Sequence, residues 1–241
     1  MTAPGSNPHK FSAAALEFIE AVAALRPKIA VFDCDGTLWE GDAGADFFYW
    51  EIERRLVPPE VARWALPRYE SYKAGEVDEE TMCGEMVAMN AGISERVLEH
   101  AAEEFFSTVV EHRIFSEMQQ LSCRLAATGC DVWAVSSTNV WVIRAAAKRF
   151  AILPDHVLAV SVEIENGIAT EKLIEVPTDE GKAVAIRKYV PGSVDVCFGN
   201  TIHDAAMLEL ARHPFAIDPT EELELVAKKK GWKIYRPGPI G

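Results

Sequence analysis

The chain has 241 residues, of which 49% are apolar and 25% are charged, and its formal net charge is −13. This length and composition predict a soluble globular protein that needs neither disulfides nor a structural metal to fold. The acidic charge argues against binding to nucleic acid, because a phosphate backbone requires a basic surface, and against a polybasic membrane contact. A phosphate-bearing ligand would need local positive charge from a metal ion or a lysine.

The cysteines and the N-terminal segment bear on the cellular compartment. The 5 cysteines are scattered and form no CxxC pair, which is typical of buried thiols in a reducing cytosol. Residues 1–10 contain no apolar run of the kind that a signal peptide requires, and the longest apolar runs are too short to span a bilayer. The sequence therefore predicts a cytoplasmic protein with no nucleic-acid or membrane partner.

Helical and strand patterns alternate along most of the chain. Residues 12–25 have the apolar spacing of a helix, and residues 29–32 form a short apolar run typical of a buried strand. Further strands are expected at 132–135, 157–162, 194–198, 215–217 and 232–235, and further helices at 115–127, 139–150, 180–189, 204–211 and 221–230. Asn166 and Gly167 predict a hairpin turn. The repeated βα units predict an α/β fold with a Rossmann-like, doubly wound, mostly parallel sheet.

One long stretch departs from this alternation. Residues 42–110 are helical in period, rich in aromatic side chains and without a convincing strand. We therefore expect a small all-α cap domain at 41–110, inserted into a core domain that consists of residues 1–40 and 111–241.

Polar side chains stand at the carboxyl ends of the predicted strands. Ligands bind at this edge of a parallel sheet, which brings Asp33, Ser136 and Asn200 together. Directly after strand 29–32, Asp33 could attack phosphorus and form an aspartyl-phosphate. Asp35 could protonate the leaving oxygen and then activate water. The alternative is that this acidic, glycine-containing segment is only a turn.

Two more positions could hold a phosphoryl group. The Ser136 hydroxyl could donate to a phosphoryl oxygen beside the positive end of the following helix, with Ser137 as a further substrate-binding candidate. Alternatively, Ser136 only caps that helix. Lys182 stands at the start of the predicted helix 180–189, where the helix dipole disfavours a positive charge. It therefore needs a partner such as a phosphoryl group or the nucleophile, unless it is a solvated surface lysine.

The loop after strand 194–198 offers oxygen ligands for a metal ion. Gly199 and Asn200 end the strand, and Asp204 follows them. Mg²⁺ takes few protein ligands and keeps several waters, so these residues could complete its ligand shell. The alternative for Asp204 is a helix N-cap.

In this order, the elements resemble the four signature motifs of haloacid dehalogenase superfamily hydrolases. The first motif matches DCDGTL at 33–38, the second Ser136, the third Lys182 and the fourth GNTIHDAAML at 199–208. The helical insert between the first two motifs resembles the phosphoserine phosphatase-like branch, subfamily IB, whose small helical cap is of the C1 type. The resemblance covers most of the chain outside the insert.

The resemblance implies a Mg²⁺-dependent phosphoric monoester hydrolase that acts on a small-molecule phosphomonoester. It implies that Asp33 is the nucleophile, that Asp35 is the acid and base, and that Ser136 and Lys182 hold the phosphoryl group. Phosphoryl transfer asks mainly for positioning and charge neutralisation, which such a set provides.

The resemblance also implies a Mg²⁺ site formed by Asp33, the backbone carbonyl of Asp35 and the loop with Asn200 and Asp204. The family usually has an aspartate at the position of Asn200, so metal affinity should fall and Asp204 should carry more of the load. His203 replaces an asparagine that is common in phosphoserine phosphatases, which puts phosphoserine itself in doubt. The dehalogenases of the superfamily lack the second aspartate of the first motif, so Asp35 argues against dehalogenation.

The substrate stays open among several phosphomonoesters. Asp42 lies where the resemblance would place a glutamate that binds a substrate amine, with a helix N-cap as the alternative. Aromatic side chains of the insert could form a cage for a quaternary ammonium, although packing is the alternative. These are Phe47, Phe48, Tyr49, Trp50, Trp64, Tyr69 and Tyr72. The candidate substrates are phosphoserine, phosphocholine and phosphoethanolamine.

Two rival functions use the same residues. A phosphotransferase would pass the phosphoryl group of the same intermediate to an acceptor hydroxyl. A catalytically weakened, ligand-binding relative is suggested by Asn200, but Asp33, Asp35, Ser136 and Lys182 are all intact, which argues against a decayed site.

Overall fold

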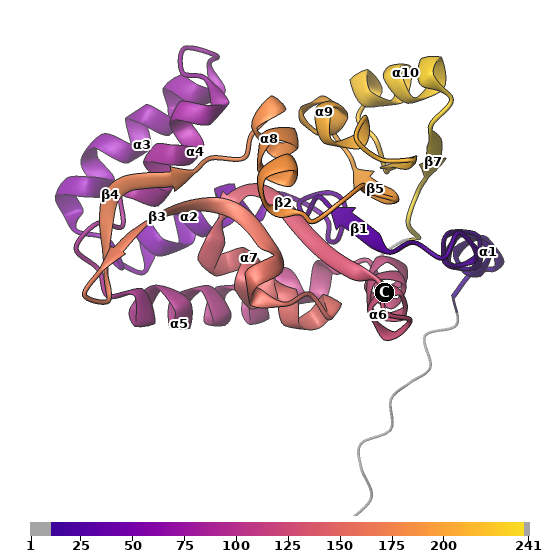
Figure 1. Cartoon of the computed structure of the whole chain (residues 1–241). Coiled ribbons are helices and arrows are strands. Elements are labelled where there is room, and N and C mark those ends of the chain that lie inside the picture. Colours follow the sequence, from indigo (N-terminus) through magenta and orange to yellow (C-terminus); the bar gives the residue numbers. More distant parts are fainter. Residues whose placement is uncertain (1–10, 239–241) are drawn as a thin grey trace, which may run out of the picture.

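The computed structural model describes residues 11–238, so residues 1–10, on which the expectation of no signal peptide rested, lie outside the described part. The centre of the molecule is a seven-stranded sheet in the order β4-β3-β2-β1-β5-β6-β7 (Figure 1). The β3–β4 pair is antiparallel and the other neighbouring pairs are parallel. The strands are β1 (Ile29–Phe32), β2 (Asp131–Asn139), β3 (Val157–Glu165), β4 (Ile168–Glu175), β5 (Val196–Gly199), β6 (His213–Ile217) and β7 (Lys233–Tyr235).

Helices cover both faces of this sheet. They are α1 (Ala13–Ala24), α2 (Ala43–Glu53), α3 (Pro59–Lys73), α4 (Glu79–Ala88), α5 (Glu95–Phe105), α6 (Ser116–Ala127), α7 (Val140–Ala147), α8 (Glu180–Tyr189), α9 (Ala205–Leu208) and α10 (Glu221–Lys230). In the part of the chain that the structure describes, none of them is both long enough and apolar enough to cross a membrane.

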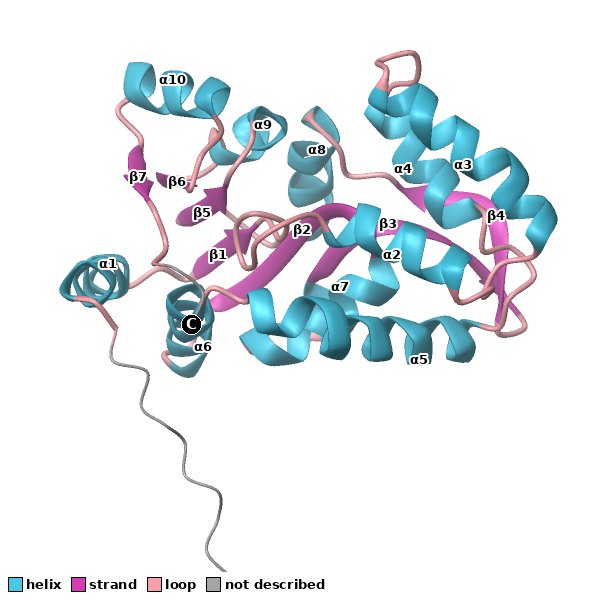
Figure 2. Ribbon diagram, turned by 180° about the vertical axis from the view of Figure 1, so that it is seen from behind, coloured by secondary structure: helices cyan, strands magenta, loops and turns pink. Residues whose placement is uncertain are grey.

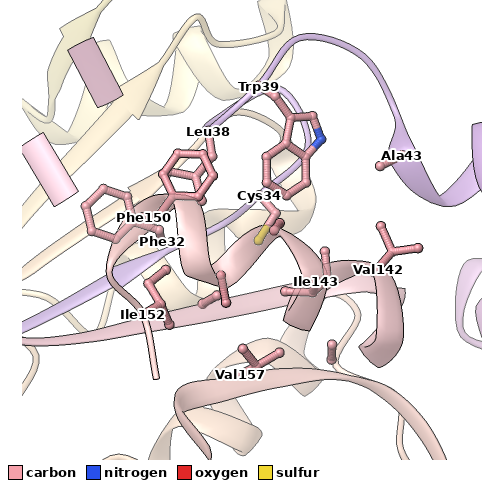
Figure 3. Packing of buried hydrophobic residues seen from close by; sticks show 14 of the residues in the cluster. Phe32, Cys34, Leu38, Trp39, Ala43, Val142, Ile143, Phe150, Ile152 and Val157 are labelled. Atoms are coloured by element: carbon pink, nitrogen blue, oxygen red, sulfur yellow. The ribbon is translucent and has the colours of Figure 1, made fainter. Parts of the chain in front are cut away.

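The central strand β1 explains why both faces are covered. Alternate residues of a strand point to opposite sides of the sheet. Ala30 and Phe32 belong to a hydrophobic cluster that includes residues of α1, α6 and α7, whereas Ile29 and Val31 belong to a second cluster with α8, α9 and α10. Figure 3 shows part of the first cluster, with Phe32 and Phe150 packed together. The predicted α/β, doubly wound, mostly parallel fold is confirmed.

Four helices, α2 to α5, come between β1 and β2 and lie at the end of the sheet that β3 and β4 form (Figure 2). They enclose a hydrophobic cluster of their own, in which the rings of Phe48 and Tyr69 stack with their centroids 4.8 Å apart. Phe47 is buried against the main core. These aromatic side chains therefore serve mainly in packing. The predicted helical insert is present and contains α2 to α5, and the domain boundaries at residues 41 and 110 stay a prediction.

The bounds of several elements differ from the predicted ones, most clearly those of β2 and of the helix after β5. Strand β2 runs on to Asn139, because Ser136 and Asn139 still pair with β3 across a register shift. The helix predicted at 204–211 is reduced to α9, preceded by a 3₁₀ turn at Ile202–Asp204. Its early end has a local cause: the backbone N–H of Arg212 already donates to the carbonyl of Val194, which leads the chain into β6.

Candidate active site

The carboxyl ends of β1, β2 and β5 meet at one edge of the sheet. Asp33 follows β1 directly, and its backbone N–H donates to the carbonyl of Phe198 in β5 at 2.9 Å. This bond continues the β1–β5 pairing past the end of β1, so the side chain of Asp33 is fixed between two strands. The predicted meeting of polar residues at this edge is therefore present in the fold.

A buried ionic network joins three of the predicted residues. Lys182 Nζ donates to Asp33 Oδ1 at 2.7 Å and to Asp204 Oδ1 at 2.6 Å. The exposed fraction is 4% for Asp33, 3% for Lys182 and 0% for Asp204. Burial lowers the pKa of Lys182, but the two carboxylates outweigh this and hold it well above its ordinary value. Lys182 is thus a buried cation and not a solvated surface lysine.

Asp33 has one oxygen in this network and one outside it. Among the described residues, Asp33 Oδ2 has no hydrogen-bond partner although it is buried. Burial, together with the negative charge of Asp204, raises the pKa of Asp33 despite the neighbouring lysine. A buried polar atom without a partner costs free energy, so this oxygen is suited to receive a ligand atom.

Asp35 points away from the lysine and toward the insert. Its Oδ1 accepts from the indole N–H of Trp39 and from the backbone N–H of Ala43, each at 2.7 Å, and its Oδ2 accepts from the Thr138 hydroxyl at 2.7 Å. Figure 3 shows the indole nitrogen of Trp39 turned toward Ala43. Burial, and then the charge of Asp42, raise the pKa of Asp35 to about 7. A carboxyl group that titrates near neutral pH can both give and take a proton.

The loop after β5 wraps around Asp204. Asp204 Oδ2 accepts from the backbone N–H groups of Asn200 at 2.8 Å and Thr201 at 2.9 Å, so both oxygens of this carboxylate are engaged. Asn200 itself lies against Gly36, where an added Cβ would come within 1.9 Å of its amide nitrogen. Gly36 has φ +72°, a conformation that glycine adopts without strain. The two motif loops therefore touch through a position that has no side chain.

The donor set at this edge fits a hard cation. Asp33 supplies a buried carboxylate oxygen that has no partner among the described residues. The loop that follows it carries the backbone carbonyl of Asp35, and the Asn200 side chain, with its amide oxygen, lies against Gly36 of the same loop. Mg²⁺ prefers such oxygen ligands and keeps several waters.

The remaining predicted positions are less constrained. Ser136 is buried, and its hydroxyl oxygen accepts from the backbone N–H of Thr138 at 3.1 Å. Ser137 lies in the same strand segment, half-buried. Asp42 is the N-cap of α2, since its Oδ1 accepts from the backbone N–H of Ala45 at 2.9 Å. The helix-cap alternative therefore holds for Asp42, and a substrate contact stays a prediction.

Sequence reasoning missed Thr138, whose hydroxyl orients Asp35. A signal existed, because Ser136 and Thr138 stand two apart in an extended segment and so share one face of it. It also missed a contact between insert and core, in which His203 Nδ1 lies 3.0 Å from Glu79 Oε2 and 2.6 Å from Asp179 Oδ1. These carboxylates raise the pKa of His203 to about 9 although burial opposes them.

Known proteins resemble this chain over most of its length. The model of the haloacid dehalogenase-like hydrolase family matches residues 30–209. A histidinol-phosphatase of Neisseria meningitidis is 26% identical over 86% of this chain and 97% of its own length. A Bordetella pertussis protein of unknown function has a similar structure, with a TM-score of 0.74 at 24% identity over 86% of this chain and 96% of that one. A probable phosphoserine phosphatase of Vibrio cholerae gives 0.63 at 19% identity over 89% and 62%. The chain belongs to the haloacid dehalogenase-like hydrolase family.

Proposed function

We propose that this protein is a Mg²⁺-dependent phosphatase that hydrolyses a small phosphomonoester through an aspartyl-phosphate on Asp33. The observation that carries the proposal is the buried Asp33–Lys182–Asp204 network, in which Asp33 keeps one oxygen without a partner among the described residues. Membership of the hydrolase family and the phosphatase names of its relatives support the enzyme class, a phosphoric monoester hydrolase.

The reaction has two steps that use Asp33 and Asp35 in turn. In the first, a carboxylate oxygen of Asp33 bonds to phosphorus, the ester P–O bond breaks, and Asp35 gives its proton to the leaving oxygen. In the second, Asp35 takes a proton from water, the water oxygen bonds to phosphorus, and the bond from phosphorus to Asp33 breaks. Inorganic phosphate leaves and both carboxyl groups return to their starting states.

The other polar groups hold charge in place during these steps. Lys182 is a buried cation next to Asp33, so it offsets the negative charge that accumulates on the transferred group. Ser136 would donate its hydroxyl proton to a phosphoryl oxygen, since its oxygen already accepts from the chain. The three hydrogen bonds to Asp35 fix the direction of its carboxyl group toward the insert, where the leaving group would lie.

We propose that Asp33, the backbone carbonyl of Asp35 and Asn200 hold Mg²⁺. Bound there, Mg²⁺ would neutralise phosphoryl charge and orient the phosphate. Asp204 has both oxygens in hydrogen bonds, so it contributes charge and holds Lys182 and the loop in place. This assigns Asp204 a less direct role than the sequence-based expectation of a main metal ligand.

We further propose that the substrate carries an amino group. The named relatives are a histidinol-phosphatase and a probable phosphoserine phosphatase, and both of those substrates are amines. Asp42 lies near enough to Asp35 for its charge to raise the pKa of Asp35, and Glu79 likewise raises the pKa of Asp42, so acidic side chains gather next to Asp35. Carboxylates of this kind favour a cationic ligand over a neutral one.

The proposal is tested by measuring phosphate release from a panel of phosphomonoesters with and without Mg²⁺. The panel contains phosphoserine, histidinol phosphate, phosphoethanolamine, phosphocholine, glycerol phosphate and an aryl phosphate. We expect Mg²⁺-dependent turnover by the wild type and a loss of roughly 10³-fold or more in Asp33→Asn. Asp155→Asn, which changes an exposed aspartate, is the matched control and should keep full activity. A wild type that is inert across the panel at high Mg²⁺ would contradict the proposal.

A further inference from the structure

Glu51 is a buried carboxyl group that the proposed reaction does not use. It lies in the last turn of α2, and only 1% of it is exposed. Glutamate is almost never buried to this degree unless it is paired. In the described part of the chain, Glu51 Oε2 has no hydrogen-bond partner. Burial raises the pKa of Glu51 well above its ordinary value, and the hydrogen bond from Asn90 opposes this only in part.

The carboxyl group of Glu51 lines a small cavity between the insert and the core. Phe47 and Met86 of the insert form apolar walls, and Ser137 and Thr138 of β2 close the cavity on the core side. The space open to the centre of a water molecule is about 10 Å³, which is room for a single water-sized group.

This cavity lies one side chain away from the proposed general acid. Thr138 lines it and donates its hydroxyl proton to Asp35 Oδ2 at 2.7 Å. Gly44 permits the close approach of α2 on this side, because a Cβ there would lie 2.7 Å from Thr138 Oγ1. A leaving group that is protonated by Asp35 would therefore extend toward the cavity.

The walls define the chemistry of the occupant. Glu51 lines the cavity, and its Oε2 has no hydrogen-bond partner among the described residues, so an occupant that donates a hydrogen bond would satisfy it. The apolar neighbours and the small volume exclude a second carboxylate and a trimethylammonium group. A primary ammonium, or one N–H edge of an imidazolium ring, fits these conditions.

We propose that Glu51 is a specificity-determining residue that binds a cationic N–H group of the substrate's leaving group. The inference rests on the proposed phosphatase function and deepens it, because it names the substrate class. It places the amine in the cavity and not at the exposed N-cap of α2, where Asp42 lies. A cationic N–H group would favour the ionised form of Glu51, and a charge-assisted hydrogen bond is about twice as strong as a neutral one, which gives the amine its advantage.

The test compares Glu51→Gln with the wild type and with Glu53→Gln, an exposed glutamate of the same helix. Histidinol phosphate and phosphoethanolamine carry N–H cations, phosphocholine carries a methylated one, and glycerol phosphate and an aryl phosphate carry none. We expect kcat/KM of Glu51→Gln to fall roughly 10- to 100-fold on the N–H cations, mostly through KM, and to stay within about twofold on the last two. Glu53→Gln should match the wild type throughout.

A second variant separates binding from packing. Glu51→Asp keeps the charge but shortens the side chain, so it should recover part of the preference for N–H cations, whereas a loss caused by packing should be at least as large in Glu51→Asp. If Glu51→Gln lowers kcat/KM equally on all substrates, or on none, the inference is overturned. If the wild type hydrolyses no member, the aryl phosphate included, the proposed function fails; if it hydrolyses the aryl phosphate without preferring amines, only this inference fails.

Discussion

The core and the insert both bury ionisable side chains, but they pair them differently. At the sheet edge, Lys182 bridges two carboxylates, and backbone N–H groups satisfy the far oxygen of Asp204. In the insert, Glu51 is as deeply buried but leaves an oxygen without a partner among the described residues. In the core network, every carboxylate oxygen except Asp33 Oδ2 has a hydrogen-bond partner among the described residues. Side chains held in this way suit a reaction that needs one fixed geometry. Glu51 of the insert lines a cavity, which suits the recognition of a group that differs from one substrate to another.

The largest expected effect is on catalysis and comes from a substitution at Asp35 in the core. Asp35→Asn should lower kcat by roughly 10²- to 10⁴-fold on alkyl phosphates, with and without an amine, because the leaving oxygen loses its proton donor. The loss should be much smaller on an aryl phosphate, whose leaving group departs without a proton. Steady-state rates on the three substrate types measure this difference. An equal loss on all three would assign Asp35 a structural role.

The next effect concerns stability. Lys182→Met leaves the carboxylates of Asp33 and Asp204 buried together without a cation, which should cost about 3–5 kcal/mol of unfolding free energy. Mg²⁺ should restore part of this loss. Urea unfolding with and without Mg²⁺ measures both quantities. Lys188 lies in the same helix as Lys182 but is exposed and pairs with Glu175 of β4, so Lys188→Met should cost at most about 1 kcal/mol. Equal losses in the two variants would contradict the network.

A smaller expected effect is on the affinity for Mg²⁺ and comes from a substitution at Asn200. Asn200→Asp should lower the Mg²⁺ concentration for half-maximal activity by about tenfold, because a charged oxygen replaces a neutral one. Without Mg²⁺ the same variant should be less stable than the wild type, since a third carboxylate joins Asp33 and Asp204. Mg²⁺ titrations of activity and of the melting temperature test both expectations. Asn166→Asp in the β3–β4 turn is the control. If Asn200→Asp changed activity and melting temperature no more than this control does, Asn200 would not be a Mg²⁺ ligand.

The smallest effect lies in the insert and depends on pH. The folded-state pKa of Glu51 is raised above its ordinary value of 4.5, so the folded protein binds more protons than the unfolded chain and loses stability as pH rises above 4.5. The melting temperature of Glu51→Gln relative to the wild type should therefore increase from pH 4 to pH 8. Glu53→Gln should show no such trend. A pH-independent difference for Glu51→Gln would mean that its carboxyl group is paired.

The meeting of the candidate site residues at one sheet edge could be predicted from sequence because they stand at strand ends and helix starts. Asp33 is marked by the apolar run before it, and Lys182 is marked by its unusual position at a helix start. The fold places Lys182 Nζ 2.7 Å from Asp33 Oδ1. Glu51 carries no such signal. Its burial depends on how α2 packs against α4 and β2, which no local pattern encodes, so a helical glutamate reads as exposed. The same reason hid Glu79, whose contact with His203 spans the insert and the core.

Gly44 links the two regions in a way that bears on how such enzymes diverge. A side chain at this position would displace the Thr138 hydroxyl, which orients Asp35, or would lift α2 from the sheet edge. The position of α2 on the core and the orientation of Asp35, the proposed proton donor, therefore depend on the same close contact. A change of residue in the helices beyond this point could therefore alter the substrate while Asp35 stays in place, whereas even one methyl group at Gly44 would disturb the proposed proton donor.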